Sequence, residues 1–325
     1  MRLLAMQDDG HAAHNLQSPA FTEQIELESS DTPLILLGNG VHAVEYKNYP
    51  RDVDDKLLKM HETRIGRLAK ILREASSDSS VLATHFLTLN CVDYFAEPTK
   101  HRFGLKFELP PRHESSPQPV SLWKALKSGK RYRLPLQKRL KLARKISEAL
   151  LNWHVAGWHH EGISSHNILF FSSPASPDPD FTMPHICGFD FSHESEEIST
   201  RDTKDRQFSI YRHPERQFDT VSSHKLRHDI YSVGVVLLDL GLWDDPDESW
   251  KTDLKYRPVN HDEARQVYRK LQQFTGRLPF YTGSCCAEAV RNCLDGECFE
   301  EASDKDTMQI FINRVLSKVH GGDGL

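Results

Sequence analysis

The sequence has no long hydrophobic run and no excess of positive charge. Its longest apolar stretch, residues 230–243, is shorter than the ~18–20 residues that a membrane-spanning helix needs, and it carries Asp239. The 41 Lys and Arg against 46 Asp and Glu give a net charge of −5. We therefore expect neither a transmembrane segment nor nucleic acid binding, because binding to phosphates requires clustered basic residues. The N-terminus turns acidic at Asp8, too early for a signal peptide, so we expect a cytoplasmic protein.

Paired cysteines are also lacking. Four of the six cysteines cluster between Cys285 and Cys298, without the C-x-x-C pairs or the neighbouring histidine of a zinc site. This arrangement favours buried or partly buried thiols on a C-terminal helix, in a reducing compartment.

Composition shifts divide the chain into four segments. Residues 1–30 are polar and are expected to form a flexible lead-in. Residues 31–112 combine strand-like alternation with apolar residues at helical spacing. The Pro- and Ser-rich residues 113–118 form a linker, and residues 119–325 are mainly helical. The sequence therefore predicts an α+β protein, with a small sheet-rich part followed by a larger helical part.

Three helices are expected from periodicity. Residues 52–75 and 136–155 both show an amphipathic pattern, with apolar residues three or four positions apart. Residues 230–242 are apolar on nearly every side, so this helix should be buried.

Residues 160–171 (HEGISSHNILFF) carry the most specific signal. The catalytic loop of a protein kinase has the frame H-R-D-L-x-x-x-N, in which Asp accepts the proton of the substrate hydroxyl and Asn holds a metal ion. His160 and Asn167 keep this spacing, but Gly162 stands in place of the Asp and Glu161 in place of the Arg. A glycine cannot accept a proton, so the loop has the frame of a kinase without its base.

Other motifs of the kinase fold occur in the expected order. They are a strand ending in Lys, a hinge-like strand, a permuted D-F-G, the end of an activation segment and the start of a central helix: residues 44–47 (VEYK), 105–109 (LKFEL), 188–190 (GFD), 211–215 (YRHPE) and 228–234 (HDIYSVG). The chain thus resembles the protein-kinase-like superfamily. The resemblance implies a bilobal fold, with a small antiparallel sheet lobe at 31–112 and a large helical lobe at 119–325.

A narrower resemblance is carried by residues 102–111 and 157–171, which are similar to a filamentous-fungal group of kinase-like domains. Those domains often follow a helical cell-death or prion-related domain, which is not visible in this sequence. The resemblance implies a role in signalling or non-self recognition, with protein partners.

The resemblance implies Lys47, Glu62, Glu108 and Asn167 as nucleotide-binding positions, with ATP and Mg²⁺ as the cofactors. Lys47 would bind the phosphates of the nucleotide and form an ion pair with Glu62. The alternative interpretation is that both residues are solvated surface charges. Glu108 lies in the hinge-like strand. Asn167 is a metal ligand in an active kinase, and its alternative role is to cap the loop turn.

The metal-binding motif is degenerate in this chain. Gly188 stands where kinases carry their main metal-binding Asp. Asp190, two residues on, would share a face with that position in an extended segment, so Asp190 and Asn167 are the remaining candidates for binding Mg²⁺. The phosphate loop is reduced to residues 38–40 (GNG), which also read as a tight turn between strands.

Two acidic residues of the family's architecture are kept. The resemblance implies that Asp229 bonds the backbone of the catalytic loop. It also implies that Glu215 pairs with a distal Arg, and no such Arg is evident after Cys293.

A dense basic run extends from Lys124 to Lys145. It is either a surface that docks an acidic partner or a membrane, or a solvated helix face.

Two main functions remain open at this stage. The first is a pseudokinase that works as a scaffold or allosteric module. The second is an active Ser/Thr protein kinase using Mg-ATP, with Lys47, Glu62, Asn167 and Asp190 as its working residues. A small-molecule kinase is a third reading, but it also needs the Asp that Gly162 replaces. The sequence favours the pseudokinase, because the residues that shape the loop survive while those that touch the reacting phosphate do not.

Overall fold

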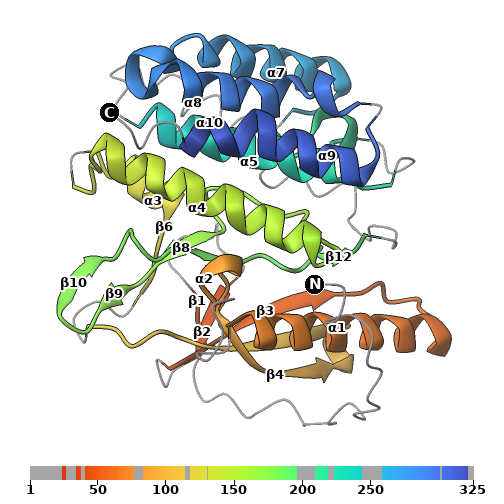
Figure 1. The fold of residues 1–325 in the computed structure, drawn as a ribbon. Coiled ribbons are helices and arrows are strands. Elements are labelled where there is room, and N and C mark those ends of the chain that lie inside the picture. The colour runs from red at the N-terminus through yellow and green to blue at the C-terminus, as the bar shows by residue number, and fades with distance from the viewer. Residues whose placement is uncertain are drawn as a thin grey trace. The chain divides into compact units, whose positions relative to one another are not determined.

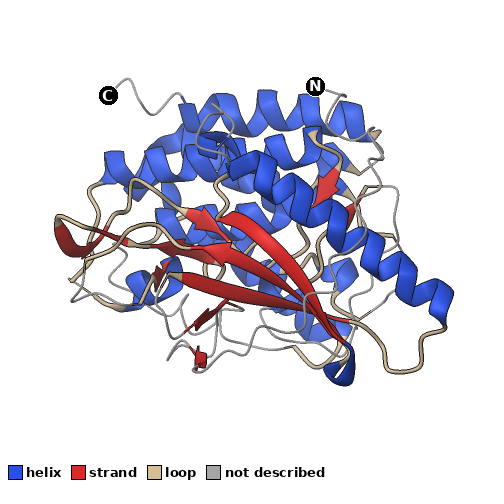
Figure 2. Ribbon diagram, turned by 90° about the horizontal axis from the view of Figure 1, so that it is seen from below, coloured by secondary structure: helices blue, strands red, loops and turns tan. Residues whose placement is uncertain are grey.

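The computed structural model describes residues 24–26, 34–37, 41–76, 83–113, 118–129, 131–195, 209–218, 223–243, 258–300 and 302–320. The chain is a mixed α+β protein with small antiparallel sheets (Figures 1 and 2), as the sequence predicts. Its contacts define two compact units. Unit 1 comprises the described residues within 1–121 and 166–193, and unit 2 those within 122–165 and 194–325. The predicted phosphate loop at 38–40 lies outside the described residues.

Unit 1 is built on a five-stranded antiparallel sheet with the order β1-β2-β3-β5-β4, drawn in red in Figure 2. Its strands are β1 (Gln24–Glu26), β2 (Leu34–Leu37), β3 (His42–Asn48), β4 (Asn90–Glu97) and β5 (Arg102–Glu108). β3 is the central strand and pairs with β5 along its whole length, from His42 opposite Glu108 to Asn48 opposite Arg102. The middle of β3 is buried from Ala43 to Glu45, and Lys47 is buried as well.

Helix α1 (Asp55–Ser76) connects β3 to β4 and packs against β4 (Figure 1). The carboxylate of Asp54 accepts a hydrogen bond from the Leu57 amide at 2.7 Å, which caps the first turn. The buried residues recur at helical spacing and form one apolar stripe: His61, Ile65, Leu68, Ala69, Leu72 and Ala75. The helix predicted at 52–75 is therefore confirmed. Between α1 and β5 the chain also forms α2 (Ala83–Phe86) and the 3₁₀ turn η1 (Pro98–Lys100).

The remainder of unit 1 comes from a later part of the chain. β8 (Ile168–Phe170) pairs with β6 (Val120–Ser121) on one side and with β11 (His185–Ile186) on the other. Between β8 and β11, β9 (Ser172–Ser173) and β10 (Ser176–Pro179) form a hairpin. The sequence-based division placed residues 166–193 with the helical part. In the structure these residues group with the sheet, because β8 pairs with β6 and the amide of Ile186 bonds the carbonyl of Leu87.

Unit 2 is mainly helical. Its elements are α3 (Leu122–Lys127), α4 (Leu136–Val155), β7 (Trp158–His159), η2 (Ser209–Tyr211), η3 (Pro214–Arg216), α5 (Leu226–Gly241), α7 (His261–Thr275), α8 (Leu278–Asp295), η4 (Glu297–Phe299), α9 (Asp304–Phe311), the π-helical turn η5 (Ile312–Leu316) and α10 (Ser317–His320). The short strand β12 (His193–Glu194) lies at the boundary between the two units. α4 has the predicted bounds of 136–155.

Helix α5 forms the core of unit 2. Every residue from Leu226 to Gly241 is buried except Arg227, as expected from its apolar composition. It packs against α4 and α8. Gly234 allows the close approach to α8, since a Cβ at this position would lie 2.5 Å from the Cβ of Cys293. Among the described helices, none has the length and apolarity to cross a bilayer.

The six cysteines are all free thiols. Cys91, Cys187, Cys286 and Cys293 are buried, Cys298 is partly buried and Cys285 is exposed. This agrees with the sequence expectation of largely buried thiols.

Candidate functional site

The middle of β3 carries two ionisable side chains on one face of the sheet, Glu45 and Lys47. Successive strand residues point to opposite faces, and Val44 packs on the other face with Leu37 and Phe95. Glu45 is only 2% exposed and Lys47 only 8% exposed. Charged groups buried this deeply need polar partners.

The carboxylate of Glu45 is held by the backbone of the permuted D-F-G segment. One of its oxygens accepts the amide of Gly188 and the other the amide of Phe189, both at 3.0 Å. The thiol of Cys187 also hydrogen-bonds this carboxylate. All of these groups belong to unit 1. Glu45 thus fixes the backbone at Gly188 and Phe189.

Burial changes the acid–base properties of this cluster. Desolvation raises the pKa of Glu45 to about 7, outweighing the two backbone amides, which lower it. The nearby carboxylate of Asp190 raises it further. Burial and the charge of Glu45 together raise the pKa of Cys187 well above its ordinary value, so this thiol is a poor nucleophile.

The ammonium group of Lys47 is bound to main-chain carbonyls. It donates to the carbonyl of Asp190 and, at 3.1 Å, to that of Ser192. The structure does not bring Glu62 to Lys47. Glu62 is half-buried on α1 beside the phenol of Tyr94, whose pKa is raised mainly by burial and further by Glu62. Lys47 therefore anchors the 190–192 segment, a role for which the sequence offered no sign.

Gly188 occupies a position where a side chain would be strained. Its φ is +88°, in the left-handed region that disfavours residues with a Cβ. A Cβ here would lie 2.3 Å from the Nδ2 of Asn167, so the side chain of Asn167 would have to shift. Asn167 is itself buried, and its backbone carbonyl accepts the amide of Cys187 at 2.8 Å. The side chain of Asn167 thus fills the space next to Gly188.

The remaining predicted ligand positions are Asp190, Glu108 and Asn167. Asp190 is half-buried, and its backbone carbonyl is taken by Lys47. Glu108 ends β5 on the exposed side, where its carboxylate accepts the side-chain amide of Asn90 at 3.0 Å. Carboxylate and amide oxygens suit Mg²⁺, so Asp190 and Asn167 have the right chemistry. However, the side chain of Asn167 is packed against Gly188.

In unit 2, the kinase-like loop is fixed by Asp229 at the start of α5. One carboxylate oxygen accepts the amide of His160 at 2.9 Å and lies 3.1 Å from the Nε2 of His154. The other accepts the amide of Glu161 at 3.0 Å and lies 3.2 Å from the Nε2 of His224. The expected bonding of Asp229 to the loop backbone is therefore confirmed. Glu161, at φ +58°, is held in a left-handed conformation within this arrangement.

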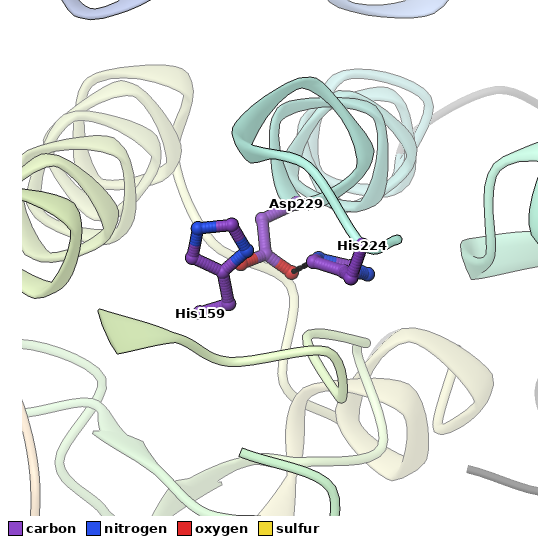
Figure 3. Close-up of side chains that lie close together, drawn as sticks. All are labelled: His159, His224 and Asp229. Carbon is purple, nitrogen blue, oxygen red and sulfur yellow. Dashed lines mark ion pairs between the residues drawn. The ribbon is translucent and has the colours of Figure 1, made fainter. Parts of the chain in front are cut away.

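Glu161 and His224 complete a buried ionic network, part of which is drawn in Figure 3. Glu161 lies 3.3 Å from a guanidinium nitrogen of Arg216 and 3.4 Å from the Nδ1 of His224. Burial alone would lower the pKa of His224, but Asp229 and Glu161 raise it to about 9. Burial would likewise raise the pKa of Asp229, but the charge of His224 and the bonds from His154 and His224 hold it well below its ordinary value. The carboxylates of Asp229 and Glu161 thus face two cations. These cations are His224 and Arg216, so the charges in the network balance.

The same network contains a potential set of metal donors. The donor atoms of His159, His224 and Asp229 lie within 4.8 Å of one another (Figure 3). Both ring nitrogens of His224 face carboxylates, so the histidine is protonated at neutral pH. A protonated ring nitrogen cannot bind a metal. The protons that His224 holds toward Glu161 and Asp229 therefore account for the cluster without an ion.

Glu215 has a partner other than the expected distal Arg. Its carboxylate lies 2.6 Å from a guanidinium nitrogen of Arg227, on the first turn of α5, and 3.4 Å from the Nε2 of His228. The missing distal Arg is thus replaced by a neighbouring one.

A second buried carboxyl group on α5, that of Asp239, has a raised pKa. Asp239 accepts hydrogen bonds from the hydroxyls of Ser165 and, at 2.8 Å, of Tyr211. Burial raises the pKa of Asp239 to about 7, outweighing these two bonds. Ser165 ends the kinase-like loop within unit 2, so the loop is tied to α5 at both of its ends.

Sequence reasoning missed Glu45 and His224. Glu45 had one signal: it continues the face formed by Val41 and Ala43 in an alternating strand, which indicates burial. His224 stands five residues before Asp229 in a segment without periodicity, and nothing in the sequence singles it out.

Comparison with protein families identifies the class of this chain. Residues 51–318 match a family described as a domain of unknown function (DUF7580), and the chain belongs to that family. The match covers α1 and most of the elements described above, including Gly188 and Asp229. A comparison with curated proteins gives no match.

Proposed function

We propose that the protein is a bilobal kinase-like domain that does not transfer phosphate and that acts by binding a protein partner. The sequence resemblance to fungal kinase-like domains suggests signalling or non-self recognition as its setting.

The arrangement within each unit supports the kinase-like part of this proposal. Unit 1 has an antiparallel five-stranded sheet, with α1 inserted between β3 and β4. Unit 2 has a buried central helix, α5, whose Asp229 bonds the backbone of the loop at His160 and Glu161. These are the features that the motif order in the sequence implies for a small sheet lobe and a large helical lobe.

The observation that carries the loss of catalysis is the packing at Gly188. Phosphoryl transfer by a kinase requires Mg²⁺ held by a carboxylate at this position. Here a side chain would be strained by the left-handed backbone and would have to displace the side chain of Asn167. The loop lacks the catalytic Asp at Gly162 as well. Two of the groups that act on the reacting phosphate are therefore absent, and a side chain at one of these positions would be strained.

The rival, an active kinase, needs Lys47 for the nucleotide. In a kinase this Lys is positioned by a Glu on the helix after its strand. The Lys47 ammonium instead bonds two backbone carbonyls, and Glu62 forms no ion pair with it among the described residues. A buried carboxylate, Glu45, lies on the same strand face and would repel phosphates when ionised.

The test is a combined binding and transfer assay on the purified chain. We expect no Mg²⁺-dependent rise in thermal stability with ATP, whereas a saturating ligand would add ~2–4 kcal/mol. We also expect no phosphate transfer to generic protein substrates or to the chain itself, where kinases turn over at about 1–100 s⁻¹.

Asp190→Ala and Asp178→Ala form a matched pair for this assay. Asp190 is the one remaining carboxylate of the permuted motif, while Asp178 is exposed on β10 in the same unit. Transfer activity that Asp190→Ala abolishes and Asp178→Ala leaves intact would refute the proposal and establish the active-kinase alternative. Affinity capture with the intact chain addresses the binding half, and a chain that remains monomeric and captures no protein reproducibly would count against it.

A further inference from the structure

The basic run of the sequence becomes a defined surface in unit 2. Residues 115–147 contain ten Lys or Arg and no Asp or Glu. The rest of the chain has 31 basic and 46 acidic residues, a net charge of −15. Positive charge is therefore concentrated in one tenth of an otherwise acidic protein, from α3 through the connection 128–135 to the first half of α4.

Burial separates structural bases from surface bases in this run. Arg139 is buried and donates to the carbonyls of Leu240 and Gly241, at the end of α5. Six others are exposed, and we call them the basic surface: Lys124, Lys127, Arg131, Arg133, Lys138 and Lys141. On α4, Lys138 and Lys141 are three residues apart and share the solvent face. The surface ends at Glu148, which pairs with Arg144 at 2.9 Å.

The position of these charges is unfavourable for the helix itself. The first turn of α4 has no acidic residue and contains Lys138 and Arg139. Cations near a helix N-terminus oppose the helix dipole and reduce stability. Helix stability therefore does not explain why the bases gather here, and a function that needs them does.

Apolar and amphipathic groups lie among the bases. Leu136 is 37% exposed at the start of α4, next to the exposed Pro135. Tyr132 is half-buried, and the guanidinium of Arg131 lies 5.0 Å from the centre of its ring. A solvent-exposed leucine and a tyrosine next to an arginine match the water–lipid interface, where apolar groups insert and cations meet headgroups. Four of the six surface bases are lysines, which act as point charges toward many anions rather than as bidentate binders of one.

We propose that the basic surface attaches the protein peripherally to a bilayer rich in anionic lipids. Clusters of four to eight Lys or Arg on a helical surface have the charge needed to bind anionic headgroups. The exposed Leu136 adds an apolar group that can insert between headgroups, so we take a bilayer as the occupant. This inference does not depend on the proposed function, because it concerns different residues from Gly188 and Lys47.

The test is co-sedimentation of the intact chain with vesicles. We expect binding to phosphatidylserine–phosphatidylcholine vesicles, weakening as salt rises, and no binding to phosphatidylcholine alone. The double substitution Lys138→Gln/Lys141→Gln should reduce the partition coefficient about thirtyfold, from about 1 kcal/mol for each base near the surface. Both side chains are exposed, so an unchanged circular dichroism spectrum and melting temperature should accompany the loss.

Lys56→Gln/Lys59→Gln is the matched control. These two lysines are also exposed and three residues apart on a helix, α1, so the chain loses the same charge elsewhere. We expect the control to bind within twofold of the original. Leu136→Gln should lower binding several-fold at high salt, where charge is screened and insertion remains.

Three results would overturn the proposal. The first is no binding of the original chain to anionic vesicles. The second is an equal loss for the α4 and α1 double variants, which would make the effect one of net charge. The third is retention of polyglutamate or RNA without vesicle binding, which would assign the surface to an acidic macromolecule.

Discussion

Two buried carboxylates, Asp229 in unit 2 and Glu45 in unit 1, differ in their acid–base behaviour. In unit 2, Asp229 stays charged, since the charge of His224 and the bonds from His154 and His224 hold its pKa well below the ordinary range. In unit 1, burial dominates at Glu45 and raises its pKa to about 7. Asp229 bonds the backbone of the loop at His160 and Glu161, whereas Glu45 bonds the backbone amides of Gly188 and Phe189. Each of these buried carboxylates thus holds a backbone segment, and only the one with charged partners keeps a low pKa.

The largest expected effect comes from breaking the unit 2 network. Asp229→Asn places an NH₂ group against N–H donors and leaves the His224 cation without one of its two carboxylates. Removing one partner of a buried ion pair typically costs about 3–5 kcal/mol. Urea unfolding at pH 7 measures this loss.

Asp239→Asn is the control for that measurement, because Asp239 is also buried on α5 but is already close to neutral at pH 7. A loss of stability as large as that of Asp229→Asn would mean that burial of a polar group, and not its charge, sets the cost.

The second effect is at Gly188. Gly188→Ala forces a Cβ into a left-handed backbone and into the Asn167 side chain, so we expect a loss of about 3 kcal/mol in unfolding free energy. Gly157 has a similar φ of +81° but open space around its Cβ position, so Gly157→Ala should lose only about 1 kcal/mol.

The double variant Gly188→Ala/Asn167→Ala sharpens this comparison. Removing the Asn167 side chain should relieve the contact and give a coupling of about 1–2 kcal/mol between the two sites. Strictly additive losses would show that Asn167 does not close the position.

Lys47→Met should destabilise the protein by about 2 kcal/mol, because two carbonyls lose a charged donor. The loss should be the same with and without ATP. Lys59→Met, on the exposed face of α1, should change stability by less than about 0.5 kcal/mol. If Lys47→Met abolished a stabilisation by ATP while the stability without ATP stayed unchanged, Lys47 would have the nucleotide-binding role expected from the sequence.

The last expected effect is a gain in stability rather than a loss, and its size depends on pH. The pKa of Asp239 is raised from 3.8 to about 7 in the folded protein, so folding is favoured at low pH and this contribution is lost as pH rises from about 4 to about 7. Asp239→Asn removes the titration. It should therefore stabilise the protein relative to the original by roughly 1–3 kcal/mol above pH 7 and by little at pH 4. A difference that stays constant between pH 4 and pH 8 would contradict the raised pKa.

Much of the fold follows from periodicity alone. The bounds of α4 and the burial of α5 are those predicted, because both depend on apolar spacing within one helix. In residues 31–112, where the sequence shows strand-like alternation, an apolar run starts at Phe86 but strand β4 begins only at Asn90, since Phe86 ends α2 and Leu87 has a φ of +53°. A short apolar run does not distinguish a strand from a helical turn.

The site was less predictable than the fold because its contacts join distant residues. The losses at Gly162 and Gly188 are visible in the motifs themselves. The Lys47–Glu62 pair was expected from family order, but the carbonyls of Asp190 and Ser192 hold the ammonium. Hydrogen bonds over more than 140 positions in sequence leave no local pattern to read.

The thiol of Cys187, next to Glu45, offers a way to measure local opening of unit 1. Cys187 is buried and holds its proton tightly, so alkylating reagents will not modify it in the closed state. Cys285 is exposed and will be modified first. The slow alkylation rate of Cys187 then reports how often the region around Gly188 opens. Any ligand that stabilises the closed state of this region will lower the alkylation rate of Cys187 without changing the rate at Cys285.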